Sequence, residues 1–138
     1  MTLRYFNVYG PRQPLKGTYA PVIGLFEEQK KARKPCTIVG DGEQRRDFTH
    51  VSDVVEANMC AMQTNCNGVF NIGTGKNHSV NDIAKLVNNP YNTIQIPSRP
   101  GEARITLADN TKAKTLLGWE PKKELHEYFE NSSKISWR

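Results

Sequence analysis

Short apolar runs alternate with segments of helical periodicity along most of the chain. The runs with strand character end at turn-forming residues, such as Gly10-Pro11 and the Gly40-Asp41-Gly42 triplet. They cover residues 3–8, 36–39, 48–51, 69–72 and 93–96. Because strands and helices take turns along the sequence, the pattern predicts the α/β class.

The first two helices are expected after the first and third strands. Pro21 suits a first helical position, and the apolar spacing that follows predicts a helix to about Arg33. Ser52 and Asp53 are expected to start the second helix. The apolar residues expected on one face of that helix are Val55, Met59 and Met62.

Two further helices have recognisable ends, and a weaker one covers residues 125–137. Ser79 and Asp82 form a capping pair. The expected apolar face that follows them is Val80, Ile83, Ala84 and Val87. Asp109 is expected to cap a helix that carries Ala113, Leu116 and Leu117, with Gly118 in the left-handed conformation at its end and Trp119 folded back.

Composition indicates one ordinary globular domain over residues 1–138. Hydrophobic residues make up 37% and charged residues 24% of the 138 positions. Apolar runs stay far below the ~20 residues that span a bilayer, and no signal segment opens the chain, so we expect a cytoplasmic protein without a membrane partner. The net charge of +5 permits an anionic partner. The densest basic stretch, Lys30 to Lys34, is typical of a solvated helix end.

Several motifs of catalysis and metal binding are incomplete in this sequence. Residues 73–76 lack the first glycine and the final hydroxyl of a P-loop, and His78 stands where a dinucleotide fingerprint needs glycine. His126-Glu127 lacks the second histidine of a zinc helix. The three histidines and three cysteines have no ligand spacing, so we expect no metal site and reduced thiols.

Four segments in order resemble extended short-chain dehydrogenases, the NAD-dependent nucleotide-sugar epimerases and dehydratases. The segments are residues 3–13, 40–51, 70–80 and 99–121. Residues 40–51 match the motif G-D-G-x-x-x-R-D-[FY]-x-x-V, and residues 99–121 contain R-P-G-E, A-D-N-T-K-A and L-G-W-E-P. The resemblance covers residues 2 to about 125 and implies the C-terminal part of a Rossmann-like fold with its small substrate-binding lobe. Residues 19–23 look most like 4-epimerases of UDP-glucose or UDP-N-acetylglucosamine.

The resemblance also implies a site for the substrate, since a guanidinium fork matches phosphate oxygens. It places Arg46 and Arg99 on the pyrophosphate, Asn7 on a substrate phosphate and Phe6 beside the nicotinamide. Ala20 and Val22 fall where the family approaches the nucleotide, and Glu102 matches an acidic position near the ribose. Apart from the resemblance, each arginine could be a surface charge, and Asn7 could satisfy a strand-end backbone group.

The chain departs from the family in its catalytic residues. None of its five tyrosines has a lysine four residues later, so the family's Tyr-x-x-x-Lys pair is absent, as is the glycine-rich loop. We therefore expect no catalytic residue here and no binding of the family's NAD by this chain alone. The region between Ser79 and Arg99 is also shorter than usual.

Three functions stay open. The chain could be the UDP-sugar-binding portion of an epimerase whose N-terminal half is supplied separately, a stand-alone nucleotide-sugar binding module, or a basic interaction protein without turnover. The ordered motifs argue against the third function and against nucleic acid as a partner. Residues 3–8 have the profile of a central strand, so we also expect an open sheet edge and self-association.

Overall fold

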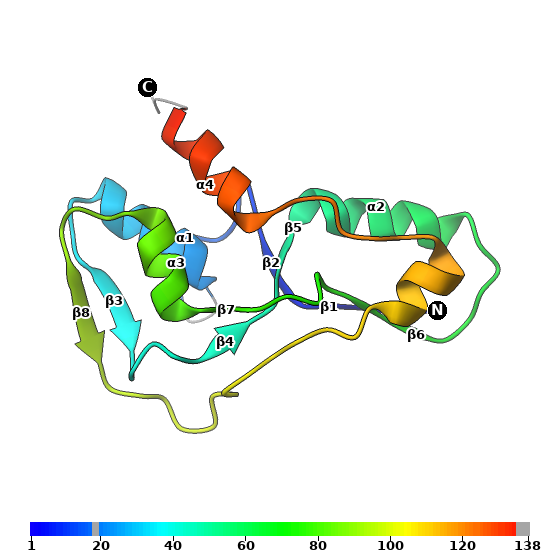
Figure 1. Cartoon of the computed structure of the whole chain (residues 1–138), viewed down its shortest axis with the longest axis horizontal. Helices are drawn as coiled ribbons and strands as arrows, with labels where there is room; N and C mark the ends of the chain where they lie inside the picture. Colours follow the sequence, from blue (N-terminus) through cyan, green and yellow to red (C-terminus); the bar gives the residue numbers. More distant parts are fainter. Residues whose placement is uncertain (18–19, 135–138) are drawn as a thin grey trace. The chain divides into compact units, whose positions relative to one another are not determined.

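The computed structural model describes residues 1–17 and 20–134, which form two compact units (Figure 1). Unit 1 contains Met1–Pro11, Asp47–Asn77 and the chain from Leu107 onward, and unit 2 contains Arg12–Arg46 and His78–Thr106. The expectation of a single domain over residues 1–138 stays a prediction. Among the described residues, no helix is long and apolar enough to cross a membrane.

Unit 1 is built on two pairs of parallel strands. β1 (Thr2–Tyr5) pairs with β6 (Val69–Ile72), and β2 (Asn7–Tyr9) pairs with β5 (Phe48–His50). The single strand expected over residues 3–8 is therefore wrong in detail, because the chain changes partners at Phe6. The Phe6 N–H donates to the Ile72 carbonyl (3.1 Å), and the next N–H, of Asn7, donates to the Asp47 carbonyl (3.0 Å).

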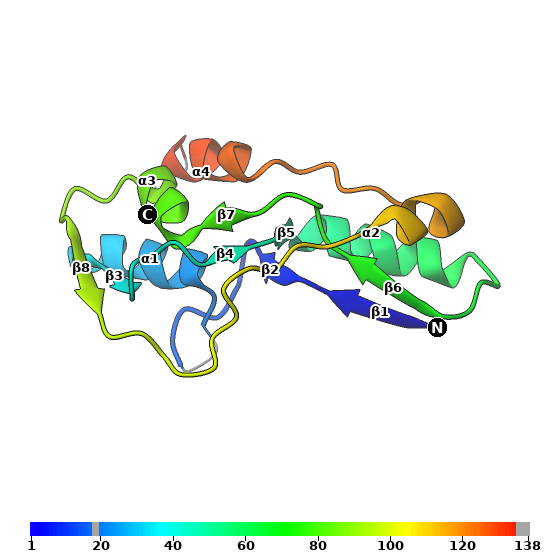
Figure 2. The same cartoon turned by 60° about the horizontal axis from the view of Figure 1, so that its bottom comes forward.

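Helix α2 (Val51–Met62) lies along the β1–β6 pair (Figures 1 and 2). The expected start was one residue late, because His50 caps the helix by accepting from the Ser52 N–H. The face with Val55, Met59 and Met62 is exposed, by 57%, 50% and 80%. The opposite side, with Val54 and Ala57, is the buried one. The expected apolar face is therefore wrong. The buried side includes the charged residue Asp53, so the positions of apolar residues alone do not identify it.

The core of unit 1 joins α2 and the strands to the C-terminal segment. The segment forms a short π-helix, η1 (Ala113–Leu117), and then helix α4 (Leu125–Lys134). As expected, Gly118 is left-handed (φ 64°) and the buried Trp119 folds back, with its N–H on the Ala113 carbonyl. The last part of the helix expected to residue 137 lies outside the described residues. The core consists of Val54, Ala57, Phe70, Ile72, Ala113, Leu117 and Trp119.

A buried carboxylate organises the turn after β6. Asp47, with no exposed surface, accepts hydrogen bonds from the N–H of Thr74 (2.8 Å) and of Gly75 (2.9 Å). It also accepts from the Thr74 hydroxyl (2.7 Å) and from the Ala108 N–H (3.1 Å). Gly73 and Gly75 therefore belong to a turn, as expected from the incomplete P-loop motif at residues 73–76.

Unit 2 contains the parallel pair β3 (Cys36–Val39) and β8 (Thr93–Ile96), and helices α1 (Val22–Lys31) and α3 (Val80–Val87) that pack side by side (Figures 1 and 2). β4 (Arg45–Arg46) pairs antiparallel with β7 (His78–Ser79). The capping pair is confirmed: the Ser79 Oγ accepts from the Asp82 N–H (3.0 Å), and the Asp82 carboxylate accepts from the Ser79 N–H (2.9 Å). The side chains that fill this unit include Ile23, Phe26, Cys36, Ile38, Ile83 and Val87.

Candidate functional site

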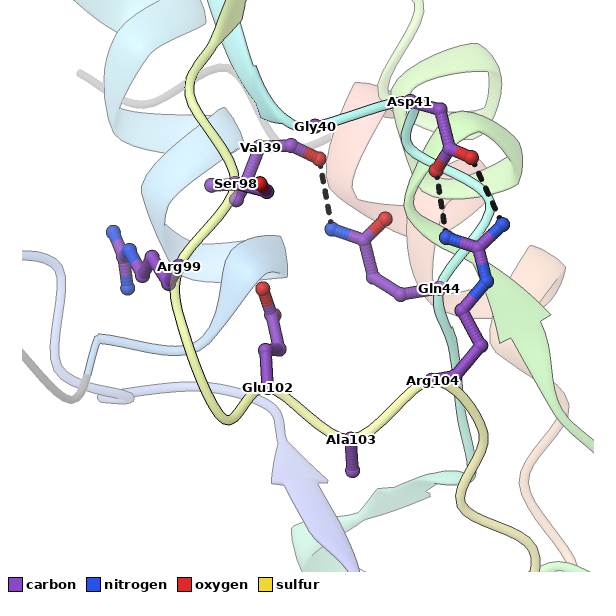
Figure 3. Close-up of a pocket in the computed structure, with 9 residues that line it drawn as sticks. All are labelled: Val39, Gly40, Asp41, Gln44, Ser98, Arg99, Glu102, Ala103 and Arg104. Atoms are coloured by element: carbon purple, nitrogen blue, oxygen red, sulfur yellow. Dashed lines mark hydrogen bonds and ion pairs between the residues drawn. The ribbon is translucent and has the colours of Figure 1, made fainter.

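The candidate site is a hollow of about 320 Å³ in unit 2 (Figure 3). It lies between the end of β3 with its Gly-Asp-Gly turn and the segment that follows β8. Its lining residues are Val39, Gly40, Asp41, Gln44, Ser98, Arg99, Glu102, Ala103 and Arg104. Most of these side chains are charged or polar, which favours a charged ligand over an apolar one.

The turn at the hollow requires glycine because the chain passes close to a neighbouring helix. Gly40 and Gly42 both have left-handed backbones (φ 61° and 73°). A Cβ on Gly42 would also lie 2.7 Å from the Cγ of Asn81 in helix α3 and 2.7 Å from the Cγ2 of Ile38 in β3. The buried Gln44 then donates from Nε2 to the Val39 carbonyl (3.0 Å), which closes the turn on the strand before it (Figure 3).

The opposite wall is attached to β4 by backbone hydrogen bonds. The Arg45 N–H donates to the Arg104 carbonyl (2.8 Å), and the Thr106 N–H donates to the Arg45 carbonyl (3.0 Å). Both walls of the hollow therefore have a fixed backbone, and the residues at its centre are held in a defined geometry.

A bidentate ion pair joins the two walls. The Arg104 guanidinium donates to both carboxylate oxygens of Asp41, at 2.8 and 2.9 Å (Figure 3). This pair, together with the Glu43 N–H that also donates to the carboxylate, lowers the pKa of Asp41 from 3.8 to about 2. Because the pKa is lowered, the pair is intact at neutral pH and is lost only as the pH falls toward 2.

We expect an NMR titration of the Asp41 carboxyl carbon to give a pKa of about 2. Substitution Arg104→Ala should raise that pKa but leave it below 3.8, because the Glu43 N–H still donates to the carboxylate. Amide spectra at each pH would verify that the fold persists. A pKa of 3.8 in the unsubstituted chain would contradict the bidentate geometry.

Glu102 lines the hollow and pairs with Arg46, which is not one of the lining residues; both are predicted site residues. An Arg46 guanidinium nitrogen, Nη2, lies 3.3 Å from the Glu102 carboxylate, and Nη1 donates to the Arg45 carbonyl at 2.9 Å. The Arg46 side chain is 15% exposed and that of Glu102 is 34% exposed. The guanidinium is therefore oriented by the backbone, and a carboxylate occupies its open side.

Arg99 lines the same hollow, but Figure 3 shows its guanidinium pointing away from the other lining side chains. This guanidinium has no hydrogen-bond or ion-pair partner among the residues that the structure describes. One unneutralised guanidinium beside two paired ones forms a site that can accept an anion with several oxygens, such as a phosphate ester.

The remaining predicted residues lie elsewhere. Ala20 and Val22 are half-buried at the start of α1 and do not line the hollow. Tyr19, which contributes to the sequence resemblance, lies outside the described residues. In unit 1, Phe6 is half-buried and close to Gly73, where a Cβ would lie 3.2 Å from the Phe6 ring. The Asn7 side chain is exposed at the start of β2.

Sequence reasoning missed Asp41, Gln44 and Arg104 as residues of the site. Asp41 and Gln44 belong to the Gly-Asp-Gly segment and Arg104 follows Arg99 by five positions. Nothing in that spacing indicates that Arg104 pairs with Asp41, because the pair depends on how the segment after β8 returns beside β4.

Comparisons with known proteins agree with this fold. The sequence profile of the family described as GDP-mannose 4,6 dehydratase matches residues 1–132. The chain is 40% identical over 126 residues to the UDP-glucose 4-epimerase of Mycolicibacterium smegmatis, which covers 88% of this chain and 40% of that protein. The chain therefore belongs to the family of NAD-dependent epimerases and dehydratases, the extended short-chain dehydrogenases, as its ordered motifs predict.

Two solved structures show the same fold. The UDP-glucose 4-epimerase of Thermotoga maritima, described with UDP-glucose, has a TM-score of 0.89 at 43% identity. The match covers 96% of this chain and 44% of the epimerase chain. The UDP-glucuronic acid 4-epimerase of Bacillus cereus, described with UDP-glucuronic acid and NAD, has a TM-score of 0.81 at 36% identity and covers 93% and 42%. The predicted Rossmann-like α/β class is confirmed, and this chain spans less than half the length of these relatives.

Proposed function

We propose that this chain is the UDP-sugar-binding portion of an NAD-dependent sugar 4-epimerase and is catalytically incomplete alone. The observation that carries the proposal is the hollow of unit 2, which Arg99 and Glu102 line and where Glu102 also pairs with Arg46. These are three of the residues that the sequence resemblance assigns to the substrate; Arg46 belongs to β4, and the other two belong to the segment after β8.

The chemistry of the hollow supports a diphosphate ester as the ligand. The Arg46 head is oriented by the Arg45 carbonyl, so little further ordering is needed when a phosphate oxygen replaces the Glu102 carboxylate beside it. The Arg99 guanidinium is exposed and without a described partner, so it is available to an anionic ligand of the hollow that Arg99 lines. The names of the relatives include both an epimerase and a dehydratase family, so nucleotide-sugar binding is the property that they share.

We infer that this chain does not bind NAD alone. Phe6 is the single residue here that the resemblance assigns to the nicotinamide, and the sequence contains neither the dinucleotide fingerprint nor Tyr-x-x-x-Lys. We therefore derive no hydride step from these residues. The proposal assigns NAD binding and the tyrosine acid/base to further polypeptide, either a separately supplied N-terminal half or a partner recruited through the open edge of β1.

Calorimetric titration with UDP-glucose and UDP-N-acetylglucosamine tests the proposal. We expect binding that Arg46→Ala weakens by about tenfold or more, because a charge-assisted hydrogen bond is lost. Arg45→Ala is the matched control: it removes the same charge one residue away, from an arginine that pairs with Asp82 at 3.6 Å, and should leave the affinity nearly unchanged. Equal losses in the two variants, or no binding by the unsubstituted chain, would contradict the proposal.

A stand-alone binding module makes the same prediction for these titrations. It is separated from the epimerase portion by adding an NAD-loaded N-terminal half of a relative and assaying interconversion of UDP-glucose and UDP-galactose. Turnover supports the epimerase portion, and binding without turnover supports the module.

A further inference from the structure

Glu102 forms an ion pair with Arg46, the residue that the proposed function assigns to the phosphate. Its carboxylate lies 3.3 Å from the Arg46 Nη2, while the Nη1 of the same guanidinium is engaged by the Arg45 carbonyl at 2.9 Å. An anion of the chain itself therefore already uses part of the donor capacity of Arg46. An external anion that takes the same Nη2 N–H must compete with that carboxylate.

We propose that Glu102 is an internal competitor for Arg46 that makes the site reject monovalent anions and admit a diphosphate. This inference rests on the proposed function, because it concerns the same arginine. It gives Glu102 a role in specificity that works through Arg46 and does not require contact between Glu102 and the ligand.

Tethering gives Glu102 an advantage over small anions. A group held on a short loop competes as if present at an effective concentration in the millimolar range. Chloride or a free carboxylate has the same single charge and no tether, so below the millimolar range it displaces Glu102 poorly. A diphosphate carries at least two charges and several oxygens, so its attraction to Arg46 exceeds that of the carboxylate.

The geometry also marks Glu102 as the carboxylate of the hollow that can leave. Asp41 is held by two bonds of 2.8 and 2.9 Å to Arg104. Glu102 makes a single, longer contact and is 34% exposed, and the turn before it contains the left-handed Gly101 (φ 77°). Figure 3 shows its side chain pointing into the hollow, where a ligand would displace it toward solvent.

The test titrates inorganic pyrophosphate, which has no ribose or sugar that could contact Glu102 directly. Glu102→Gln keeps the size of the side chain and removes its charge. We expect this variant to bind pyrophosphate about threefold to fivefold more tightly, the worth of one partly exposed ion pair. Its affinity should also fall more steeply with added chloride, because a monovalent anion now has access to Arg46.

Two variants separate competition from a general change in charge. Glu43→Gln makes the same charge change in the same unit, at a residue that accepts a hydrogen bond from Asn81, and should leave pyrophosphate affinity nearly unchanged. The double variant Arg46→Ala with Glu102→Gln should lose the gain, because there is no longer a guanidinium to release. Thermal unfolding by circular dichroism verifies that each variant is folded.

The outcomes distinguish the inference from the proposed function. UDP binding by the unsubstituted chain, together with unchanged pyrophosphate affinity or unchanged chloride sensitivity in Glu102→Gln, overturns the inference alone. An equal gain in Glu43→Gln, or a gain that survives Arg46→Ala, overturns it as well. Absence of UDP binding in both the unsubstituted chain and Glu102→Gln overturns the proposed function and the inference together.

Discussion

Substitution Asp47→Asn is expected to lower the free energy of unfolding by about 1–3 kcal/mol for each buried donor that it leaves without an acceptor. One carboxylate oxygen, Oδ1, accepts from the N–H and the hydroxyl of Thr74, and the other, Oδ2, accepts from the N–H groups of Gly75 and Ala108. Asparagine has one acceptor oxygen and one NH2 group. Turned one way, its NH2 faces the N–H groups of Gly75 and Ala108, and turned the other way it faces the N–H of Thr74, so at least one buried N–H loses its acceptor.

Urea unfolding followed by circular dichroism measures the effect. Asp41→Asn is the matched control, since it makes the same chemical change at an exposed carboxylate, and exposed pairs contribute little to stability. A loss at Asp47 no larger than the loss at Asp41 would show that the turn of residues 73–75 does not depend on this carboxylate. Because most domains have only about 5–15 kcal/mol of stability, we expect Asp47→Asn to have a lowered melting temperature even where it still folds.

Features of the fold that depend on neighbouring residues were predictable from the sequence. The capping pair of Ser79 and Asp82 and the left-handed Gly118 each follow from a side chain or backbone that acts within a few residues. The strands at residues 36–39 and 93–96 also have the bounds that their apolar runs predict. For these elements, local physical preference and the final fold agree.

Features that depend on distant partners were not predictable. The buried face of α2 was missed because Asp53 is on it, and Asp53 is buried because its carboxylate accepts from the N–H groups of Lys122 and Lys123, about seventy positions later. For the candidate site, the resemblance supplied Arg46, Arg99 and Glu102, while Asp41 and Arg104 emerged only from the structure. In both cases a polar residue has its role through a partner that sequence spacing does not identify.

Trp119→Ala is expected to lower the free energy of unfolding by about 3–5 kcal/mol, the usual cost of removing a buried large aromatic side chain. Trp119 is 1% exposed and packs in the core of unit 1. Its indole Nε1 donates to the Asp53 carbonyl at 2.9 Å, so the side chain also connects the C-terminal segment to α2. Tyr91→Ala, at an aromatic residue that is 38% exposed, is the control and should change stability by no more than about 0.5 kcal/mol.

Trp119→Phe separates the two contributions of this side chain. Phenylalanine keeps most of the apolar surface but leaves the Asp53 carbonyl without its donor, so we expect a smaller loss of about 1–2 kcal/mol in urea unfolding. A loss in Trp119→Phe equal to that in Trp119→Ala would assign the stabilisation to the hydrogen bond, and no loss would assign it to packing. Because Asp53 also accepts from Lys122 and Lys123, combining Trp119→Phe with Asp53→Ala should cost less than the sum of the two, since both substitutions release the same segment from α2.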